Sequence, residues 1–167
     1  MNKNNLVQTL QEIRFLHDID AAHLEQIAEI AQICDFDVKN VVFSEGETAQ
    51  SVYFVVSGKL SLELSPGTDF RKQLVTVGPG EMLGWSSLLE NLRFAATAIV
   101  IEPTRLVRID GAGLRSICDD DPRFGYEFMR RTMRSLAGRL KETWRQLSYV
   151  YLSHQVPLSA SNVERDL

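Results

Sequence analysis

The hydrophobic residues of this chain follow first a helical period, then a strand period, then a helical period again. Apolar residues recur weakly at helical spacing over residues 5–16, and a clearer helix follows Asp20, whose side chain can accept hydrogen bonds from the first amide groups. From Ile33 the chain changes to short runs of β-branched and aromatic residues. Over residues 59–65, leucines alternate strictly with polar residues, which predicts a half-buried strand.

Short strands separated by turns continue through the middle of the chain. Gly58 interrupts one apolar run, and residues 95–101 and 105–109 read as two strands because Pro103 between them cannot donate a hydrogen bond in a central ladder. Short, evenly spaced strands of this kind indicate an antiparallel sandwich or barrel. The expected fold is mainly β: an antiparallel β jelly roll (double-stranded β-helix) over about residues 33–110, with flanking N-terminal helices.

The last part of the chain predicts one long helix that carries a heptad seam. Asp121 followed by Pro122 is a typical helix start, so we expect a dimerisation helix over about 121–152, which closes a single domain of residues 1–152, and a flexible tail over 153–167. The seam could pack on the chain's own barrel, but its length and regularity favour pairing with the same helix of a second subunit in a homodimer. The expected interface residues are Met129, Met133, Leu136, Leu140, Leu147 and Val150.

Composition and charge narrow the class of protein. With 44% hydrophobic residues, 24% charged residues and no apolar run of membrane-spanning length or signal-peptide type, the chain reads as a cytoplasmic globular protein without a membrane segment. Its net charge of −4 argues against a nucleic-acid footprint over the whole surface. However, residues 121–150 carry seven Lys or Arg and three acidic residues, a stretch that could attract an anionic ligand or partner. Cys34 and Cys118 lie far apart in sequence and are expected to be reduced thiols.

Several motifs, taken together with this order of elements, resemble the cyclic-nucleotide-binding domain of the catabolite activator protein and its bacterial relatives. The motifs are Glu45-Gly46-Glu47, the run from Tyr53 to Gly58, the run from Val77 to Gly84 and the run from Ala95 to Ala98. The resemblance covers roughly residues 15–152. It implies an antiparallel jelly roll, dimerised through parallel C-terminal helices, with a small ligand between barrel and helix. In that family a cassette of glycine, glutamate, short helix and arginine holds a cyclic nucleotide: the glutamate accepts the ribose hydroxyl, and the arginine and helix amides hold the phosphate.

The matching cassette spans residues 84–97 here and departs from the family pattern at both charged positions. Trp85 stands where the glutamate is expected and Phe94 where the arginine is expected, while Arg93 lies one residue earlier. In an extended segment, a shift of one residue reverses the direction of the side chain. Each lost charge-assisted contact costs about 1.5–3 kcal/mol, so two losses would weaken cyclic AMP binding about a hundredfold or more.

The expected ligand-binding residues combine this cassette with one residue of the long helix. They are Gly84, Trp85, Ser86, Ser87, Arg93, Phe94, Ala95, Ala96 and Thr143. Trp85 and Phe94 are either apolar plugs that close the former nucleotide pocket or a stacking platform for a different planar ligand.

The polar candidates also have two interpretations each. Ser87 and Glu90 have the spacing of a capping box, which leaves Ser86 as the freer hydroxyl. Arg93 is either an exposed surface residue or a relocated clamp for an anion. Thr143 is either a tolerated polar residue of the seam or, as the resemblance implies, a hydroxyl that meets the ligand from the dimer helix.

Neither catalysis nor direct DNA binding is expected. His17 and His23 precede the barrel and His154 follows the long helix, so no metal-binding cluster forms on the strands, and no nucleophile–base pair stands out. Too few residues follow Leu152 to build a helix-turn-helix. Two functions remain: a dimeric sensor for a cyclic nucleotide or other small anion, with altered or lost cyclic AMP recognition, and a ligand-free dimerising scaffold for a partner protein.

Overall fold

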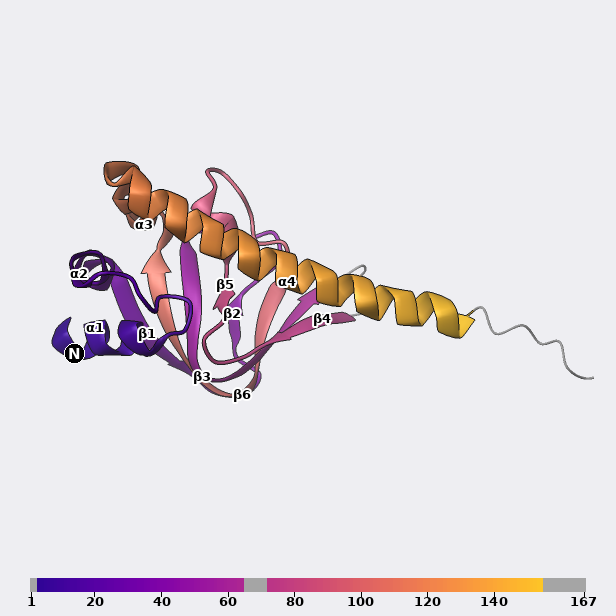
Figure 1. Cartoon of the computed structure of the whole chain (residues 1–167). Helices are drawn as coiled ribbons and strands as arrows, with labels where there is room; N and C mark the ends of the chain where they lie inside the picture. The colour runs from indigo at the N-terminus through magenta and orange to yellow at the C-terminus, as the bar shows by residue number, and fades with distance from the viewer. Residues whose placement is uncertain (1–2, 65–71, 155–167) are drawn as a thin grey trace, which may run out of the picture.

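The computed structural model describes residues 3–64 and 72–154, and its elements follow the predicted order of helices, strands and helices (Figure 1). Most of the expected tail, residues 155–167, lies outside the described residues, and the last helix extends two residues beyond its predicted end. The elements are α1 (Lys3–Glu12), α2 (Ala21–Glu29), β1 (Ala31–Phe36), β2 (Val41–Phe43), β3 (Ser51–Leu64), β4 (Lys72–Val77), β5 (Met82–Leu83), the 3-10 helix η1 (Trp85–Leu88), β6 (Thr97–Asp110), α3 (Gly111–Asp120) and α4 (Pro122–His154).

The strands form one antiparallel sheet, which confirms the expected jelly roll with flanking helices. The strand order is β1-β6-β3-β4, with β2 added to β6 and β5 added to β3. β3 and β6 pair along most of their length, from Ser51 opposite Asp110 to Glu63 opposite Thr97. These two long strands therefore form the centre on which the cassette and the helices are placed.

Both central strands are longer than the sequence predicts, because the expected breaks at Gly58 and Pro103 are irregularities within strands. β6 runs continuously through Pro103, so the prediction of two separate strands is wrong. Pairing with β3 jumps at this point from Lys59–Glu102 to Ser57–Arg105. The backbone amide of Lys59 donates to the hydroxyl of Thr104 at 3.0 Å, and Pro103 lies beyond the last residue pair of β1. Pro103 therefore belongs to no residue pair with β3 or β1, which is where a residue without an amide hydrogen is tolerated in a strand.

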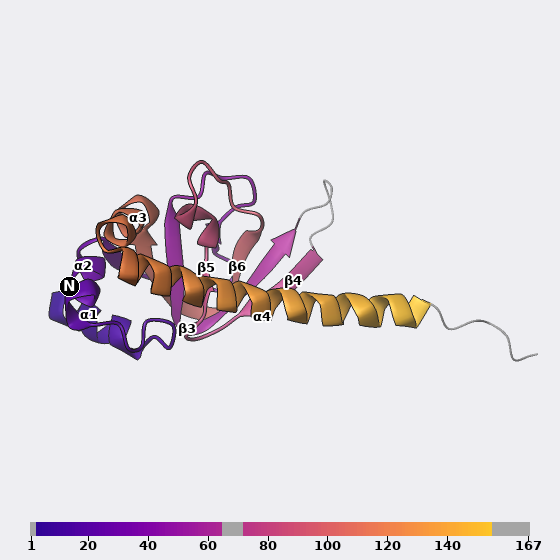
Figure 2. The ribbon, with the colours of Figure 1, turned by 45° about the horizontal axis from the view of Figure 1, so that its top comes forward.

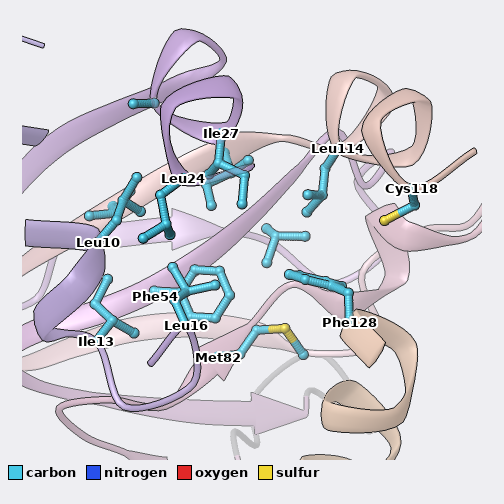
Figure 3. Close-up of a cluster of buried hydrophobic side chains, with 14 of the residues drawn as sticks. Leu10, Ile13, Leu16, Leu24, Ile27, Phe54, Met82, Leu114, Cys118 and Phe128 are labelled. Atoms are coloured by element: carbon cyan, nitrogen blue, oxygen red, sulfur yellow. The ribbon is translucent and has the colours of Figure 1, made fainter. Parts of the chain in front are cut away.

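The alternation of side chains along the central strands creates two cores on opposite faces of the sheet. On β3, Val52 and Phe54 face the helices, whereas Tyr53 and Val55 face the inside of the barrel. Figure 3 shows residues of the helix-side core from all four α-helices, from the loop after α1 and from strands β3 and β5, directed toward one another. The labelled members are Leu10, Ile13, Leu16, Leu24, Ile27, Phe54, Met82, Leu114, Cys118 and Phe128.

Helix α4 packs on the domain with its first turns and leaves it with its last turns. Asp121 caps its start, since its carboxylate accepts from the amides of Arg123 at 2.9 Å and Phe124 at 3.2 Å. Phe124 and Phe128 are buried in the helix-side core. Both ribbon views show the C-terminal end of the helix projecting beyond the strands (Figures 1 and 2). Several large apolar side chains on this part are exposed: Met133, Leu140, Trp144, Leu147 and Tyr149.

Candidate functional site

The cassette begins with a glycine that no other residue can replace without strain. Gly84 has a φ of +78°, and a Cβ at this position would lie 2.7 Å from the carbonyl oxygen of Ser51 and 3.1 Å from the ring of Tyr53. The left-handed backbone and the close approach to β3 therefore both require glycine. Gly84 is followed directly by η1.

The two serines of η1 are buried, and one of them is occupied by the turn itself. The Ser87 hydroxyl donates to the carbonyl oxygen of Gly84 at 2.9 Å, and the Ser87 backbone carbonyl accepts from Arg115 of α3. Ser87 lies within the short helix and does not precede one, so the predicted capping box with Glu90 is wrong. Ser86 is also buried, and its backbone carbonyl accepts from the amide of Leu89 at 3.2 Å.

Phe94 occupies the inside of the barrel where the resemblance places an arginine. Its side chain is 6% exposed, and its ring stacks on Phe43 with a centroid distance of 3.9 Å and an interplanar angle of 18°. The backbone on either side is held by the facing loop, because the Phe94 amide donates to Glu47 and the Phe94 carbonyl accepts from Gly46, both at 2.9 Å. An apolar ring, rather than a guanidinium, therefore faces the barrel interior.

Arg93 points the other way, as the alternation of an extended segment predicts. It is exposed, and its guanidinium donates to the carbonyl oxygen of Gly46 at 2.6 Å. Its backbone forms a bridge with Thr48. Arg93 thus holds the loop before β3 in place, and this hydrogen bond uses part of the donor set that an anion clamp would need.

Trp85 and Phe94 lie in different cores. Trp85 is half-buried and packs against the helix-side core, whereas Phe94 belongs to the barrel core. Each aromatic residue therefore fills its own side of the sheet, and the two rings do not form a common wall.

The remaining candidates contribute little side-chain polarity to the cassette. Ala95 is exposed and Ala96 is half-buried. Thr143 is exposed on α4, and its hydroxyl donates to the Arg139 carbonyl one turn earlier, at 3.0 Å. The structure brings Gly84 and Phe94 into contact, since a Cβ at the glycine would lie 3.4 Å from the Phe94 ring.

Burial disfavours the charged form of two ionisable side chains, Tyr53 and Cys118. Burial raises the pKa of Tyr53, which lines the barrel beside Gly84. Burial also raises the pKa of Cys118 to about 11, so this thiol is unreactive at neutral pH. Across residues 3–64 and 72–154, no three or more His, Cys, Asp or Glu side chains are arranged to hold a metal ion.

Sequence reasoning missed a second group of charged residues, which lies outside the cassette. Arg14, Arg134 and Arg139 line a cleft between α4 and the turn that joins β4 to β5. The signal available in the sequence was the excess of positive charge over residues 121–150. That signal cannot include Arg14, which only the tertiary fold brings beside the helix.

This chain is similar in sequence to a known domain family and to several known proteins. Residues 34–121 match the family model of the cyclic nucleotide-binding domain. A Rhodopseudomonas palustris protein named as a potassium channel is 33% identical over 103 residues, 62% of this chain and 24% of that protein. A CRP-like cAMP-activated global transcriptional regulator of Mycobacterium tuberculosis is 30% identical over 126 residues, 75% of this chain and 54% of the regulator.

A solved structure resembles most of the chain. The structure of a cyclic nucleotide-binding protein from Geobacter metallireducens matches with a TM-score of 0.70 at 25% identity, over 84% of this chain and 98% of that one. The chain spans about a quarter of the channel protein and about half of the regulator named above. None of the helices in the described part of the chain has both the length and the apolar character needed to cross a membrane.

Proposed function

This chain belongs to the cyclic nucleotide-binding domain family, and we propose that it is a small-ligand-sensing regulatory module whose cassette has altered or lost cyclic AMP recognition. The family is regulatory rather than catalytic, and we assign the chain no enzymatic role. We further propose that residues 1–152 act as a single domain in the cytoplasm, without direct contact to DNA.

One observation carries this proposal: Phe94 fills the position of the phosphate-binding arginine with a buried, stacked ring. The ring stacks on Phe43 at a centroid distance of 3.9 Å, so position 94 itself presents an apolar surface to the barrel interior. A cyclic phosphate placed against it would lose its charge-assisted partner and its water together. Arg93 does not compensate, because its guanidinium is exposed and donates to Gly46.

A ligand at the cassette would act through the position of α4. Trp85 begins η1 and packs against the helix-side core, to which Phe128 of α4 also belongs. Any ligand that moves Trp85 therefore changes the surface on which α4 rests. A ligand with different affinities for the two arrangements would shift their populations and so regulate whatever α4 contacts.

The surface that α4 presents supports a homodimer as the functional unit. Met133, Leu140 and Leu147 recur every seven residues, and their side chains are 71%, 50% and 50% exposed. A seam of this period matches the packing of two parallel helices. Among the other expected interface residues, Leu136 is half-buried, Met129 partly packs on the chain's own core, and the Val150 side chain lies outside the described residues.

The assembly is tested by placing charge in the seam. The double substitution Leu136→Glu and Leu140→Glu should convert a dimer to a monomer in light scattering, since a dimer would have to bury unpaired carboxylates. Lys141→Glu changes the charge on the neighbouring exposed position and should leave the dimer intact. A wild-type protein that is already monomeric would contradict the dimer proposal.

The ligand proposal is tested by thermal unfolding with cyclic nucleotides. A ligand that binds only the folded state raises Tm, so we expect no shift with cyclic AMP at micromolar concentration. Phe94→Arg restores the charge at the cassette, and it should create or strengthen a cyclic AMP shift if the protein tolerates the substitution. A clear shift of the wild-type protein at micromolar cyclic AMP would refute the proposed change in recognition.

The second candidate function is a ligand-free dimerising scaffold for a partner protein. The observation in its favour is the exposed aromatic surface of α4, where Trp144 is 61% and Tyr149 68% exposed. Aromatic residues of this kind are frequent anchors of protein interfaces. Absence of any Tm shift across a wide panel of cyclic nucleotides and small anions at millimolar concentration would favour this scaffold over the sensor.

A further inference from the structure

A cleft that contains no cassette residue lies between α4 and the turn that joins β4 to β5. Its volume is about 680 Å³, within the range of about 300–1,000 Å³ that is usual for small-molecule sites. One wall is the face of α4 around Gly138, a second is the turn from Gly78 to Gly80, and the third is the connection between α1 and α2 at Arg14 and Phe15. Three segments that are distant in sequence therefore enclose one volume.

The most telling feature of the cleft is the half-buried guanidinium of Arg139. One of its Nη atoms donates to the backbone carbonyl of Met82, but its Nε atom is buried and has no hydrogen-bond partner in the described part of the chain. Burial lowers the pKa of Arg139. Glu81 nearby offsets only part of this effect. A desolvated cation with an unsatisfied donor is unfavourable, so this side chain is suited to receive an anion.

The acidic residues of the cleft are Glu81 and Glu142. The charge of Glu81 attracts Arg139, but the hydrogen bonds of both carboxylates go to other partners. Glu81 accepts a hydrogen bond from the backbone amide of Gly78 at 2.7 Å, which closes the β4–β5 turn. Glu142 pairs with Arg145 on its own helix at 3.1 Å. These contacts leave the positive charge of the cleft only partly compensated.

Two further guanidinium groups stand at the same cleft. Arg14 and Arg134 are exposed, and no ion pair is recorded for either one among the described residues. Elsewhere on α4, by contrast, Arg130 and Arg131 both pair with Glu127, at 2.7 Å and 3.0 Å. Within the described part of the chain, Arg14 and Arg134 thus add two guanidinium groups without an ion pair beside Arg139, although Arg123 of α4, outside the cleft, has none either.

We propose that this cleft binds a phosphate-bearing small molecule, whose phosphate accepts hydrogen bonds from Arg139, Arg134 and Arg14. Arginine matches phosphate oxygens in geometry and charge, and the hydroxyl groups of Thr76 and Ser135 in the lining add further donors. The rest of the ligand would lie on apolar lining. Because the three arginines come from α4 and from the α1–α2 connection, the bound phosphate would fix the helix to the start of the chain.

The probe is inorganic pyrophosphate, titrated by calorimetry into the full chain at low ionic strength, with sodium chloride at matched ionic strength as the blank. We expect the wild-type protein to bind pyrophosphate. Arg134→Gln and Arg14→Gln should each weaken the affinity about tenfold or more, the usual loss for one charge-assisted hydrogen bond. The matched control is Arg123→Gln, which removes the same charge from an exposed position of α4 outside the cleft and should leave the affinity unchanged.

Two outcomes would overturn this site: no binding of pyrophosphate by the wild-type protein, or equal affinity of the cleft variants and the Arg123 variant. Arg14 and Arg134 are exposed, so their variants test the site even if substitution of the half-buried Arg139 prevents folding. The cassette proposal is tested separately by cyclic AMP and by Phe94→Arg, so either proposal can fail without the other.

Discussion

Replacing Phe94 by alanine should destabilise the folded chain by about 3–5 kcal/mol, the usual cost of removing a buried phenylalanine. The side chain is 6% exposed, so nearly all of its surface is removed from water. Its stacking on Phe43, at a centroid distance of 3.9 Å, accounts for about 0.5–1.5 kcal/mol of that loss. If the ring served only as a loose platform for a ligand, its removal would lower the free energy of unfolding by less than about 1 kcal/mol, as at other surface positions.

Urea unfolding, followed by tryptophan fluorescence at fixed protein concentration, measures this difference. The concentration is held constant because any association of chains would add to the apparent stability. Leu92→Ala is the matched control, since Leu92 lies two residues earlier in the same segment and is 39% exposed. A double substitution of Phe43 and Phe94 to alanine should destabilise by less than the sum of the single changes, because the two rings contact each other.

If Phe94→Ala and Leu92→Ala lower the free energy of unfolding by amounts within about 1 kcal/mol of each other, the burial of Phe94 contributes less than a buried position should. The ring would then not be a structural part of the barrel core. The position would have to be reconsidered as part of an adaptable ligand surface. An unchanged urea m value in both variants is needed for the comparison, since a change in m would signal a change in the unfolded or folded state.

Two further substitutions test the backbone and the charges of the fold. Gly58→Ala should cost about 2–5 kcal/mol in urea unfolding, because its φ is +87° and a Cβ would lie 2.2 Å from a carbonyl oxygen of β6. Gly46 has a φ of +82°, and a Cβ there would have no atom within 4 Å, so Gly46→Ala should cost only the strain of the left-handed backbone. Equal losses for the two variants would show that the close contact of position 58 with β6 adds nothing to the cost. Hydrogen bonds from Arg130, and to a smaller extent from Arg131, lower the pKa of Glu127 from 4.5 to about 2. These hydrogen bonds therefore stabilise the folded chain fully above about pH 4.5, and the stabilisation is lost as the pH falls toward 2. Glu127→Gln should therefore be less stable than wild type at pH 7 and approach it near pH 2, and parallel pH profiles would contradict this.

The site shows how a small shift in sequence changes the chemistry of a cassette. Arg93 and Phe94 are adjacent, yet one is exposed at a loop and the other is buried in the barrel. The sequence predicted this reversal, because neighbouring side chains of an extended segment face opposite ways. It could not predict that Phe43 lies against Phe94, since the contact depends on how two distant segments are brought together.

Features that depend on neighbours in sequence were predictable from the sequence alone. The caps at Asp20 and Asp121 were expected, and each carboxylate accepts from the amide three residues later, at 3.1 Å and 3.2 Å. The alternation over residues 59–65 correctly indicated a strand, since a period of two follows from strand geometry. The family cassette was likewise recognisable as a short contiguous pattern. Local periodicity and capping are properties of the chain before it packs, which is why these predictions held.

Tertiary structure decided the features that need a partner from elsewhere in the chain. Gly58 and Pro103 look like strand breaks in isolation, but facing each other they form one irregularity inside two continuous strands. Trp85 and Phe94 look like a pair, but the sheet separates them into two cores. The arginine cleft exists only because the start of the chain lies beside α4, which places Arg14 at the same cleft as Arg134 and Arg139 of the helix. The sequence by itself determined the order of helices and strands and the family, whereas long-range packing determined where the long strands continue and which side chains share a site.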